Sequence, residues 1–160
     1  LSIQQIKSKG LVFQCHKTAE KDCLLGDHHL LGQVFLNLFL NGIDATERGG
    51  SLTVSTHTVG QQSLPWRQGI KAARTWIEVR IRDSGVGITP ENRERIFDPF
   101  FTTKANGTGL GLSVAPGIVI EHHGLIDVES SPGAGTCFHV FLPLLEDPVS
   151  VDACDRKGVA

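Results

Sequence analysis

Residues 76–88 read WIEVRIRDSGVGI, in which a strand-like run, Trp76 to Arg82, leads directly into Asp83 and two nearby glycines. The end of a strand holds a carboxylate rigidly, and Gly85 and Gly87 allow backbone to approach a flat ligand closely. By itself, an Asp-x-Gly-x-Gly pattern is equally typical of a tight turn between a strand and a helix. The stretch therefore predicts a strand and a candidate ligand site that other parts of the chain must support.

One long helix is predicted upstream of this strand. Asp27 is a suitable N-cap, apolar residues recur after it at helical spacing, and Gly49-Gly50 ends the pattern. The recurring positions are Leu30, Leu31, Val34, Phe35, Leu38 and Ile43. A helix with one apolar face is expected to pack that face on a sheet.

Shorter apolar or alternating runs predict further strands. They cover Leu11 to Gln14, Cys23 to Leu25, Leu52 to Thr56, Leu125 to Ser130 and Cys137 to Leu142. A short helix is predicted from Pro90 to about Ile96, and another is expected to begin near Gly109. Pro116 would lie inside that second helix and is expected to bend it after Leu112.

Composition sets the class of protein. With 160 residues, 40% hydrophobic and 20% charged, the chain has the size of one globular domain. We expect this domain over residues 1–146 and a polar, disordered tail over 147–160. The stretch 57–75 has no clear period and predicts a long connection. The four cysteines form no Cys-x-x-Cys pair, which favours reduced thiols.

Charge and hydropathy exclude several classes of partner. A net charge of -2 without a Lys/Arg tract argues against nucleic acid. No apolar run approaches about 18 residues, so we expect no membrane contact by this segment and a cytoplasmic location. The chain begins at Leu1 without a methionine, so we expect it to be an excerpt, and membrane anchoring of a parent protein stays open.

Residues 107–112, Gly-Thr-Gly-Leu-Gly-Leu, form a glycine-rich loop before the predicted second helix. Such a loop presents free N–H groups and the positive end of a helix to an anion such as a phosphate. The spacing matches neither the dinucleotide-binding fingerprint nor the P-loop. It therefore indicates a different kind of phosphate site.

Asn37 and Asn41 lie four residues apart, on one face of the long helix. Amide oxygens are suitable ligands for Mg²⁺, which takes few protein ligands and fills the remaining positions with water and phosphate oxygens. Hydrogen bonds from these amides to neighbouring backbone are an equally good explanation.

In order and spacing, these motifs resemble the N, G1, F, G2 and G3 boxes of sensor histidine kinases, most closely the nitrogen-regulator type with a short ATP lid. The matching stretches are 37–41, 83–87, 96–104, 107–112 and 133–136, within a similarity over about 9–143. The resemblance implies an α/β two-layer sandwich, the Bergerat ATP-binding fold, in which a mixed sheet is backed by three helices. ATP would lie across the helical face, and the lid would cover about residues 98–107.

The resemblance also implies a role for each matching residue. Asp83 would accept the exocyclic amine of adenine, and Gly85 and Gly87 would leave room for the ring. Asn41 would hold Mg²⁺ between the phosphates, with help from Asn37.

Further nucleotide contacts are implied around these residues. Thr136 would assist at the adenine, and Lys104 in the lid would add a positive charge beside the phosphates. The other cofactor-binding residues implied are Ile88, Gly107, Thr108, Gly109, Leu110, Gly111 and Leu112. The aromatic lid residues, Phe97, Phe100 and Phe101, would pack the lid and face a helical domain outside this chain.

Asn37 separates the possible activities. ATPases of the same fold carry a glutamate one helical turn before the Mg-binding asparagine, and an amide cannot replace it as a general base. We therefore expect a protein-histidine kinase that transfers the ATP γ-phosphate, with Asn37, Asn41 and Lys104 as its catalytic residues. A GHKL-type ATPase and a degenerate nucleotide-binding interaction module remain as alternatives.

The acceptor histidine is expected on a separate phosphoacceptor domain of the same protein, which would form a homodimer and signal to a response regulator. None of the seven histidines here lies in the His-Glu or His-Asp context that the family uses. We expect the isolated chain to bind ATP with little autophosphorylation. One departure from the pattern is Asp44, which stands where many relatives have a basic residue, and another is Gly42, which replaces the more common alanine.

Overall fold

The computed structural model describes residues 2–20, 22–60, 75–104 and 107–145. The predicted tail, 147–160, and residues 61–74 of the predicted connection lie outside the described residues.

Five strands form one mixed sheet in the order β1-β2-β3-β5-β4. The strands are β1 (Val12–Lys17), β2 (Ser51–Gly60), β3 (Thr75–Asp83), β4 (Leu125–Ser130) and β5 (Thr136–Pro143). The β1·β2 pair is parallel and every other neighbouring pair is antiparallel. The predicted mixed sheet is confirmed.

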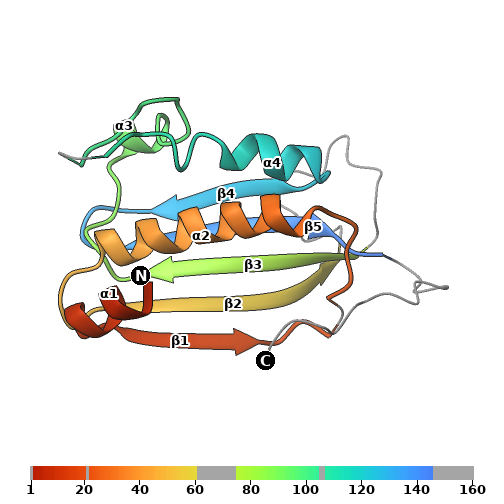
Figure 1. Ribbon diagram of the computed structural model, residues 1–160, viewed down its shortest axis with the longest axis horizontal. Helices are drawn as coiled ribbons and strands as arrows, with labels where there is room; N and C mark the ends of the chain where they lie inside the picture. Colours follow the sequence, from red (N-terminus) through yellow and green to blue (C-terminus); the bar gives the residue numbers. More distant parts are fainter. Residues whose placement is uncertain (1, 21, 61–74, 105–106, 146–160) are drawn as a thin grey trace.

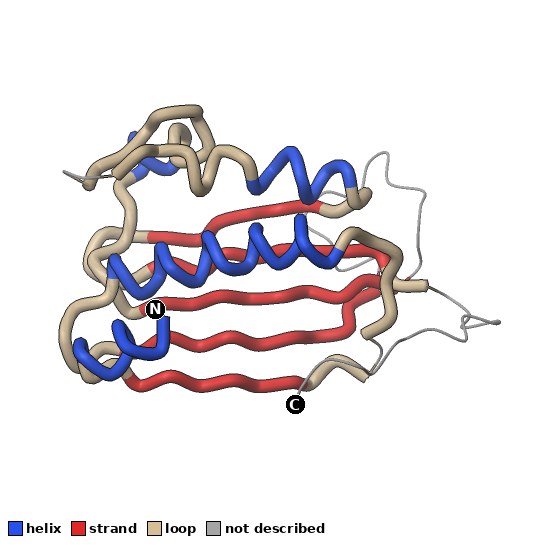
Figure 2. The backbone as a smooth tube through the Cα atoms, viewed as in Figure 1, coloured by secondary structure: helices blue, strands red, loops and turns tan. Residues whose placement is uncertain are grey.

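The helices in the described part of the chain are α1 (Ser2–Lys9), α2 (His28–Ala45), α3 (Pro90–Arg93) and α4 (Ala115–Glu121). Figures 1 and 2 show α1, α2 and α4 on the same side of the sheet, with α2 running across its middle. This arrangement is the expected two-layer α/β sandwich. The short polar helix α1 was not predicted, because its sequence, SIQQIKSK, has no apolar stripe of sufficient length.

The core lies between α2, α4 and the sheet. Val34, Leu38 and Ile43 on one face of α2 are fully buried against strand residues that include Leu52 and Val140. Successive side chains of a strand point to opposite faces of the sheet, so every second strand residue contributes its side chain to this core layer. At about 25 cal/mol per Å² of buried apolar surface, the hydrophobic layer is the dominant stabilising term.

Both ends of α2 have a local explanation. The Asp27 carboxylate accepts hydrogen bonds from the backbone N–H groups of His29 and Leu30, at 2.8 and 3.1 Å, which confirms the predicted N-cap. The helix ends at Ala45, four residues before the predicted glycine stop. Thr46 leaves the helical conformation there, and its buried hydroxyl donates to the carbonyl oxygen of Gly42 at 2.6 Å.

Two strand predictions were inaccurate. Cys23 to Leu25 does not form a strand: Leu24 packs on the core, Leu25 is 83% exposed, and no strand of the described residues pairs with the run. The Cys23 carbonyl oxygen accepts a backbone hydrogen bond from Leu145, two residues after β5, at 3.0 Å. In contrast, residues 57–60 were assigned to a connection and instead extend β2, because they pair with the first residues of β3.

Two helix predictions were also displaced. The helix from Pro90 ends at Arg93 and continues only as turns. The second helix begins at Ala115 rather than near Gly109, whose φ of +67° is incompatible with a helix. Pro116 therefore lies in the first turn, where a missing N–H costs no hydrogen bond, so the predicted bend does not arise.

Candidate functional site

Asp83 is the last residue of β3 and is buried, with 4% of its surface exposed. Its Oδ1 accepts hydrogen bonds from the backbone N–H of Gly85 at 2.8 Å and of Thr136 at 3.2 Å. Burial raises the pKa of Asp83, and these two hydrogen bonds oppose the shift without cancelling it. Within the described residues no hydrogen bond engages Oδ2, which lies near Gly42 of α2 and is left to accept from a ligand.

The glycines after Asp83 allow two close backbone approaches. A Cβ on Gly85 would lie 2.3 Å from the carbonyl oxygen of Ala45, at the end of α2. Gly87 has φ +70°, and a Cβ there would lie 1.9 Å from the carbonyl oxygen of Ser131. Both contacts join the loop after β3 to its neighbours, so both positions require glycine.

A hydroxyl network supports this loop from the β4–β5 turn. The Ser130 hydroxyl donates to the carbonyl oxygen of Gly135 at 2.9 Å, accepts from the N–H of Ile88 at 2.8 Å and lies 2.9 Å from the Thr136 hydroxyl. Gly135 has φ +80°, and a Cβ there would lie 2.1 Å from the carbonyl oxygen of Asp83. The network thus positions Asp83 and Thr136 relative to each other.

The two asparagines of α2 have different partners. The Asn37 amide nitrogen donates to the carbonyl oxygen of Gly111 at 2.8 Å, which joins α2 to the glycine-rich loop. The Asn41 Oδ1 accepts a hydrogen bond from the Lys104 ammonium at 2.9 Å. That ammonium also lies 2.8 Å from the Asp44 carboxylate. The structure therefore brings Lys104, Asn41 and Asp44 together at one point on α2.

The glycine-rich loop packs against the lid. Gly109 has φ +67°, its carbonyl oxygen accepts from the N–H of Phe100 at 3.1 Å, and a Cβ there would lie 2.3 Å from the Phe100 backbone. A Cβ on Gly107 would likewise lie 2.2 Å from the hydroxyl oxygen of Thr102. Thr108 and Leu110 are exposed, whereas Leu112 packs against the core. Gly107 and Gly109 thus lie against the lid, whereas Gly111 lies against Asn37 of α2.

The aromatic lid residues divide into two groups. Phe97 and Phe101 pack against the core, and the Arg95 guanidinium lies 4.7 Å from the centre of the Phe101 ring. Phe100 is 74% exposed and has φ +66°, which is unusual for a bulky residue. The fold therefore leaves one aromatic ring unburied beside the glycine-rich loop.

Comparisons with known proteins agree with this geometry. Residues 26–146 match the family described as histidine kinase-, DNA gyrase B-, and HSP90-like ATPase. The chain belongs to this family. The matched range contains the buried aspartate, the asparagines of α2 and the glycine-rich loop.

Similar proteins include a sensor histidine kinase and a sporulation kinase. The chain is 42% identical to sensor histidine kinase ZraS of Klebsiella oxytoca over 74% of its own length and 23% of ZraS. It is 36% identical to sporulation kinase C of Bacillus subtilis over 92% of its length and 31% of that kinase. The chain thus spans about a quarter to a third of the length of these curated relatives.

Solved structures lead to the same group. The catalytic domain of histidine kinase ThkA, in a nucleotide-free form, superposes with a TM-score of 0.70 at 30% identity, covering 88% of this chain and 84% of that domain. ThkA has also been solved in complex with response regulator protein TrrA. The family, the curated relatives and ThkA together identify the chain as an ATP-binding catalytic domain of the histidine kinase type.

Sequence motifs singled out Asp83, Thr136 and the glycines as candidate site residues of this histidine kinase-type domain. The structure brings Asp83, Gly85 and Thr136 together at the end of β3, and it places Gly107 and Gly109 against the lid. Motifs did not identify Ser130 as a supporting residue or Asp44 as a partner of Lys104. Ser130 carries no signal beyond its place before a Ser-Pro-Gly turn. Asp44 was visible as a departure from the family pattern, but its partner lies 60 residues away in sequence.

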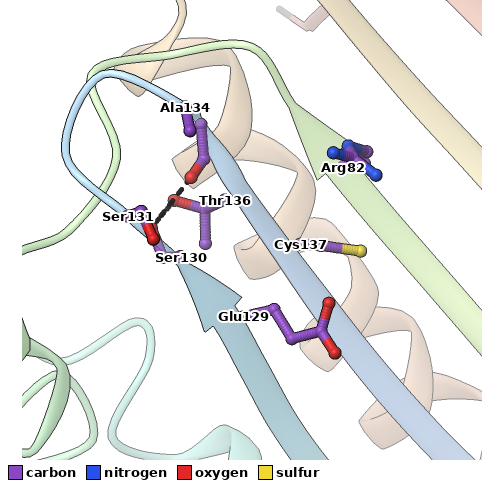
Figure 3. A pocket seen from close by; sticks show the side chains of 8 residues that line it. Arg82, Glu129, Ser130, Ser131, Ala134, Thr136 and Cys137 are labelled. Atoms are coloured by element: carbon purple, nitrogen blue, oxygen red, sulfur yellow. Dashed lines mark hydrogen bonds between the residues drawn. The ribbon is translucent and has the colours of Figure 1, made fainter.

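The other face of the sheet carries a small hollow at the ends of β3, β4 and β5 (Figure 3). Its cavity volume is about 150 Å³, and its lining includes Arg82, Glu129 and Cys137. Pockets for drug-sized ligands typically measure about 300–1,000 Å³, so this hollow does not compete with the helical face as an ATP site.

A charged cluster lies on the same face of the sheet. The buried Glu78 carboxylate pairs with Arg80 and with His139, each at 2.8 Å. Burial raises the pKa of Glu78, but the hydrogen bonds from these two partners outweigh it and leave the pKa below its usual value. The neighbouring Cys137 sulfur and the Glu78 carboxylate raise the pKa of His139 to about 9 against the effect of burial.

A second histidine has a structural role. His122 is buried, its Nε2 accepts from the backbone N–H of Asp27 at 2.9 Å, and its Nδ1 lies 2.7 Å from the carbonyl oxygen of Ile118. The Nδ1 contact holds the ring against α4, and the Nε2 hydrogen bond joins the end of α4 to the start of α2. Among the described residues, no helix is long and apolar enough to cross a membrane.

Proposed function

We propose that this domain binds Mg-ATP on its helical face and transfers the γ-phosphate to a histidine on a separate phosphoacceptor domain of the same protein. The observation that carries the proposal is the environment of Asn37, one helical turn before Asn41. An ATPase needs a general base at such a position to activate water. Asn37 offers an amide, and that amide is already bonded to the backbone of Gly111.

Asp83 supports the orientation of ATP within the site. Its Oδ1 is held by two backbone N–H groups, so Oδ2 has a fixed position from which to accept the adenine amine. A preorganised acceptor of this kind loses little entropy when it binds. Thr136 and Ile88 border the same place through the Ser130 network, and Gly85 and Gly87 let the loop after β3 pack closely on Ala45 and Ser131.

The α2 residues fit a divalent cation. Asn41 Oδ1 already accepts from a positive group, and Asp44 adds a carboxylate oxygen nearby, which are the oxygen ligands that Mg²⁺ prefers. Asn41 would hold the ion, with Asn37 as its predicted helper. When bound, Mg²⁺ supplies charge neutralisation for the phosphates.

The phosphates would lie against the lid and the glycine-rich loop. The Lys104 ammonium is within reach of Asn41, so it can neutralise phosphate charge beside the ion. Backbone N–H groups of Gly109 and Gly111 would approach the phosphates, with Gly107, Thr108, Leu110 and Leu112 around them. The domain's contribution to transfer is then position and electrostatics rather than covalent chemistry.

The proposed partners follow from the relatives and from the exposed lid. The complex of ThkA with TrrA supports a response regulator as the downstream partner. The exposed ring of Phe100 beside the phosphate loop would face the phosphoacceptor domain, which we propose to dimerise in the full-length protein. We propose a cytoplasmic location for this domain.

Titration with ATP and ADP by calorimetry, with and without Mg²⁺, tests the proposal, followed by a phosphate-release assay on the same sample. Binding with negligible turnover supports a kinase domain that awaits its histidine partner. Sustained phosphate release that disappears in the variant Asp83→Asn would favour an ATPase instead. Absence of nucleotide binding would favour a degenerate interaction module.

A further inference from the structure

Two oxygens of α2 converge on a single positive charge. The Lys104 ammonium lies 2.9 Å from Asn41 Oδ1 and 2.8 Å from Asp44 Oδ2. Asn41 and Asp44 are three residues apart on one helix, so their side chains are neighbours, whereas Lys104 reaches them from the lid. Among the described residues, the ion pair between Lys104 and Asp44 is the charged contact between the lid and α2.

We propose that Asn41 and Asp44 form one cation site, which the Lys104 ammonium occupies when no nucleotide is bound and which a divalent cation must take over from it. The inference rests on the proposed function for the identity of the ion, Mg²⁺. It adds Asp44 to the residues that contact the ion. It also makes release of Lys104 from α2 a requirement for metal loading.

Geometry makes the two occupants exclusive. A magnesium ion bound to Asn41 Oδ1 would stand about 2.1 Å from that oxygen, on the side where the ammonium now stands at 2.9 Å. An ammonium nitrogen and a metal ion on the same side of one oxygen would overlap, so the two cannot be bound there together. One of them has to leave, and only the lysine has a long side chain that can move toward the phosphates.

Exposure makes the exchange easy. The side chains of Lys104 and Asp44 are 44% and 45% exposed, so the ion pair between them is screened and weak. A weak pair holds the lid residue in place without preventing a metal-nucleotide complex from replacing it. Lys9 does not compete for the site, because its ammonium is bonded to the backbone carbonyl oxygens of Ile43, Asp44 and Thr46.

The test measures metal binding without nucleotide. Mn²⁺ is titrated into the isotopically labelled chain, and the paramagnetic broadening of the Asn41 side-chain amide signal gives the apparent affinity. The variant Lys104→Met keeps the apolar stem and removes the competing charge. We expect it to bind Mn²⁺ about three- to tenfold more tightly than the natural chain, the range expected for loss of an exposed ion pair and hydrogen bond.

Removal of the carboxylate should act in the opposite direction. We expect Asp44→Asn to weaken Mn²⁺ binding at Asn41 by about three- to tenfold, because it removes the negative charge of the site. Lys17→Met on β1 and Glu47→Gln after α2 are matched controls, since both residues are exposed and outside the site. Both controls should leave the titration unchanged, and thermal unfolding should confirm that every variant is folded.

Three results would overturn the proposal: unchanged Mn²⁺ affinity in Lys104→Met, unchanged affinity in Asp44→Asn, or broadening that avoids Asn41 in every variant. These results are distinct from failure of the proposed function. A chain that does not bind ATP in calorimetry would refute the kinase assignment, whereas the Mn²⁺ titration involves no nucleotide. Normal ATP binding together with an unresponsive Lys104→Met would refute the shared cation site alone.

Discussion

The substitution Asp83→Asn tests the adenine assignment most directly. In the variant the amide oxygen can still accept from the N–H groups of Gly85 and Thr136, so the loop after β3 keeps its support. The position of Oδ2 becomes an NH₂ group, which is a donor that faces the donor amine of adenine. Binding therefore loses an acceptor and gains an opposed pair of donors.

The expected loss can be worked from these two changes. A hydrogen bond to a charged acceptor contributes about 1.5–3 kcal/mol, and an unsatisfied buried donor costs about 1–3 kcal/mol. Together they reduce the binding free energy by roughly 3–5 kcal/mol, which is about 200- to 4,000-fold in affinity. Fold stability should not fall, because burial raises the pKa of Asp83 and shows that its charge is unfavourable inside the fold.

Calorimetric titration with ADP measures the loss, and Asp22→Asn serves as the control because Asp22 is exposed and lies outside the helices and strands that form the site. Thermal unfolding should give a midpoint for Asp83→Asn at or above that of the natural chain. An affinity within about threefold of the natural value, in a folded variant, would refute the assignment of Asp83 to adenine.

Three further substitutions follow from the same structure. Asn41→Ala should weaken ATP binding with Mg²⁺ more than binding without it, and equal losses in calorimetry would refute the ligand role. Gly87→Ala should lower the free energy of unfolding in urea by about 2–3 kcal/mol or more, because its φ is +70° and a Cβ would meet Ser131; a change below about 0.5 kcal/mol would contradict that contact. His139 contributes stability that is fully present below about pH 6.5 and lost as pH rises through its pKa of about 9, because the folded state holds the proton more tightly. The melting temperature of the natural chain should therefore decline between pH 6 and pH 10, and His139→Gln should make this decline smaller. An unaltered decline in the variant would show that another group causes it.

The elements that could be predicted from sequence are those whose signal is local. Alternation in β3, β4 and β5 and the N-cap at Asp27 depend on neighbouring residues, and the structure confirms them. The run at Cys23 to Leu25 is apolar like a strand, but no strand in the described part of the chain pairs with it, and a run of three residues does not specify a pairing partner. The start of α4 was misplaced because the glycine pattern does not reveal that Gly109 adopts a positive φ.

The candidate site also contains residues that have a local sequence signal and residues that have none. Sequence motifs single out Asp83 and the glycines as candidates because each motif is contiguous. The Asp44–Lys104 pair and the support from Ser130 depend on contacts between segments that are far apart in sequence. Such contacts are set by the packing of α2, the lid and the β4–β5 turn, so only a three-dimensional structure identifies them.

The contact made by Lys9 bears on where this domain can be cut. Its ammonium caps three carbonyl oxygens at the end of α2, at 2.7 to 3.1 Å, where the helix dipole favours a positive charge. The family match begins only at residue 26, after both α1 and β1. A fragment started there would lose this cap and would turn β2 into an unprotected edge strand, whose free N–H and C=O groups invite pairing with other copies. Preparations trimmed to the family boundary should therefore aggregate, whereas those that retain Lys9 and β1 should stay monodisperse.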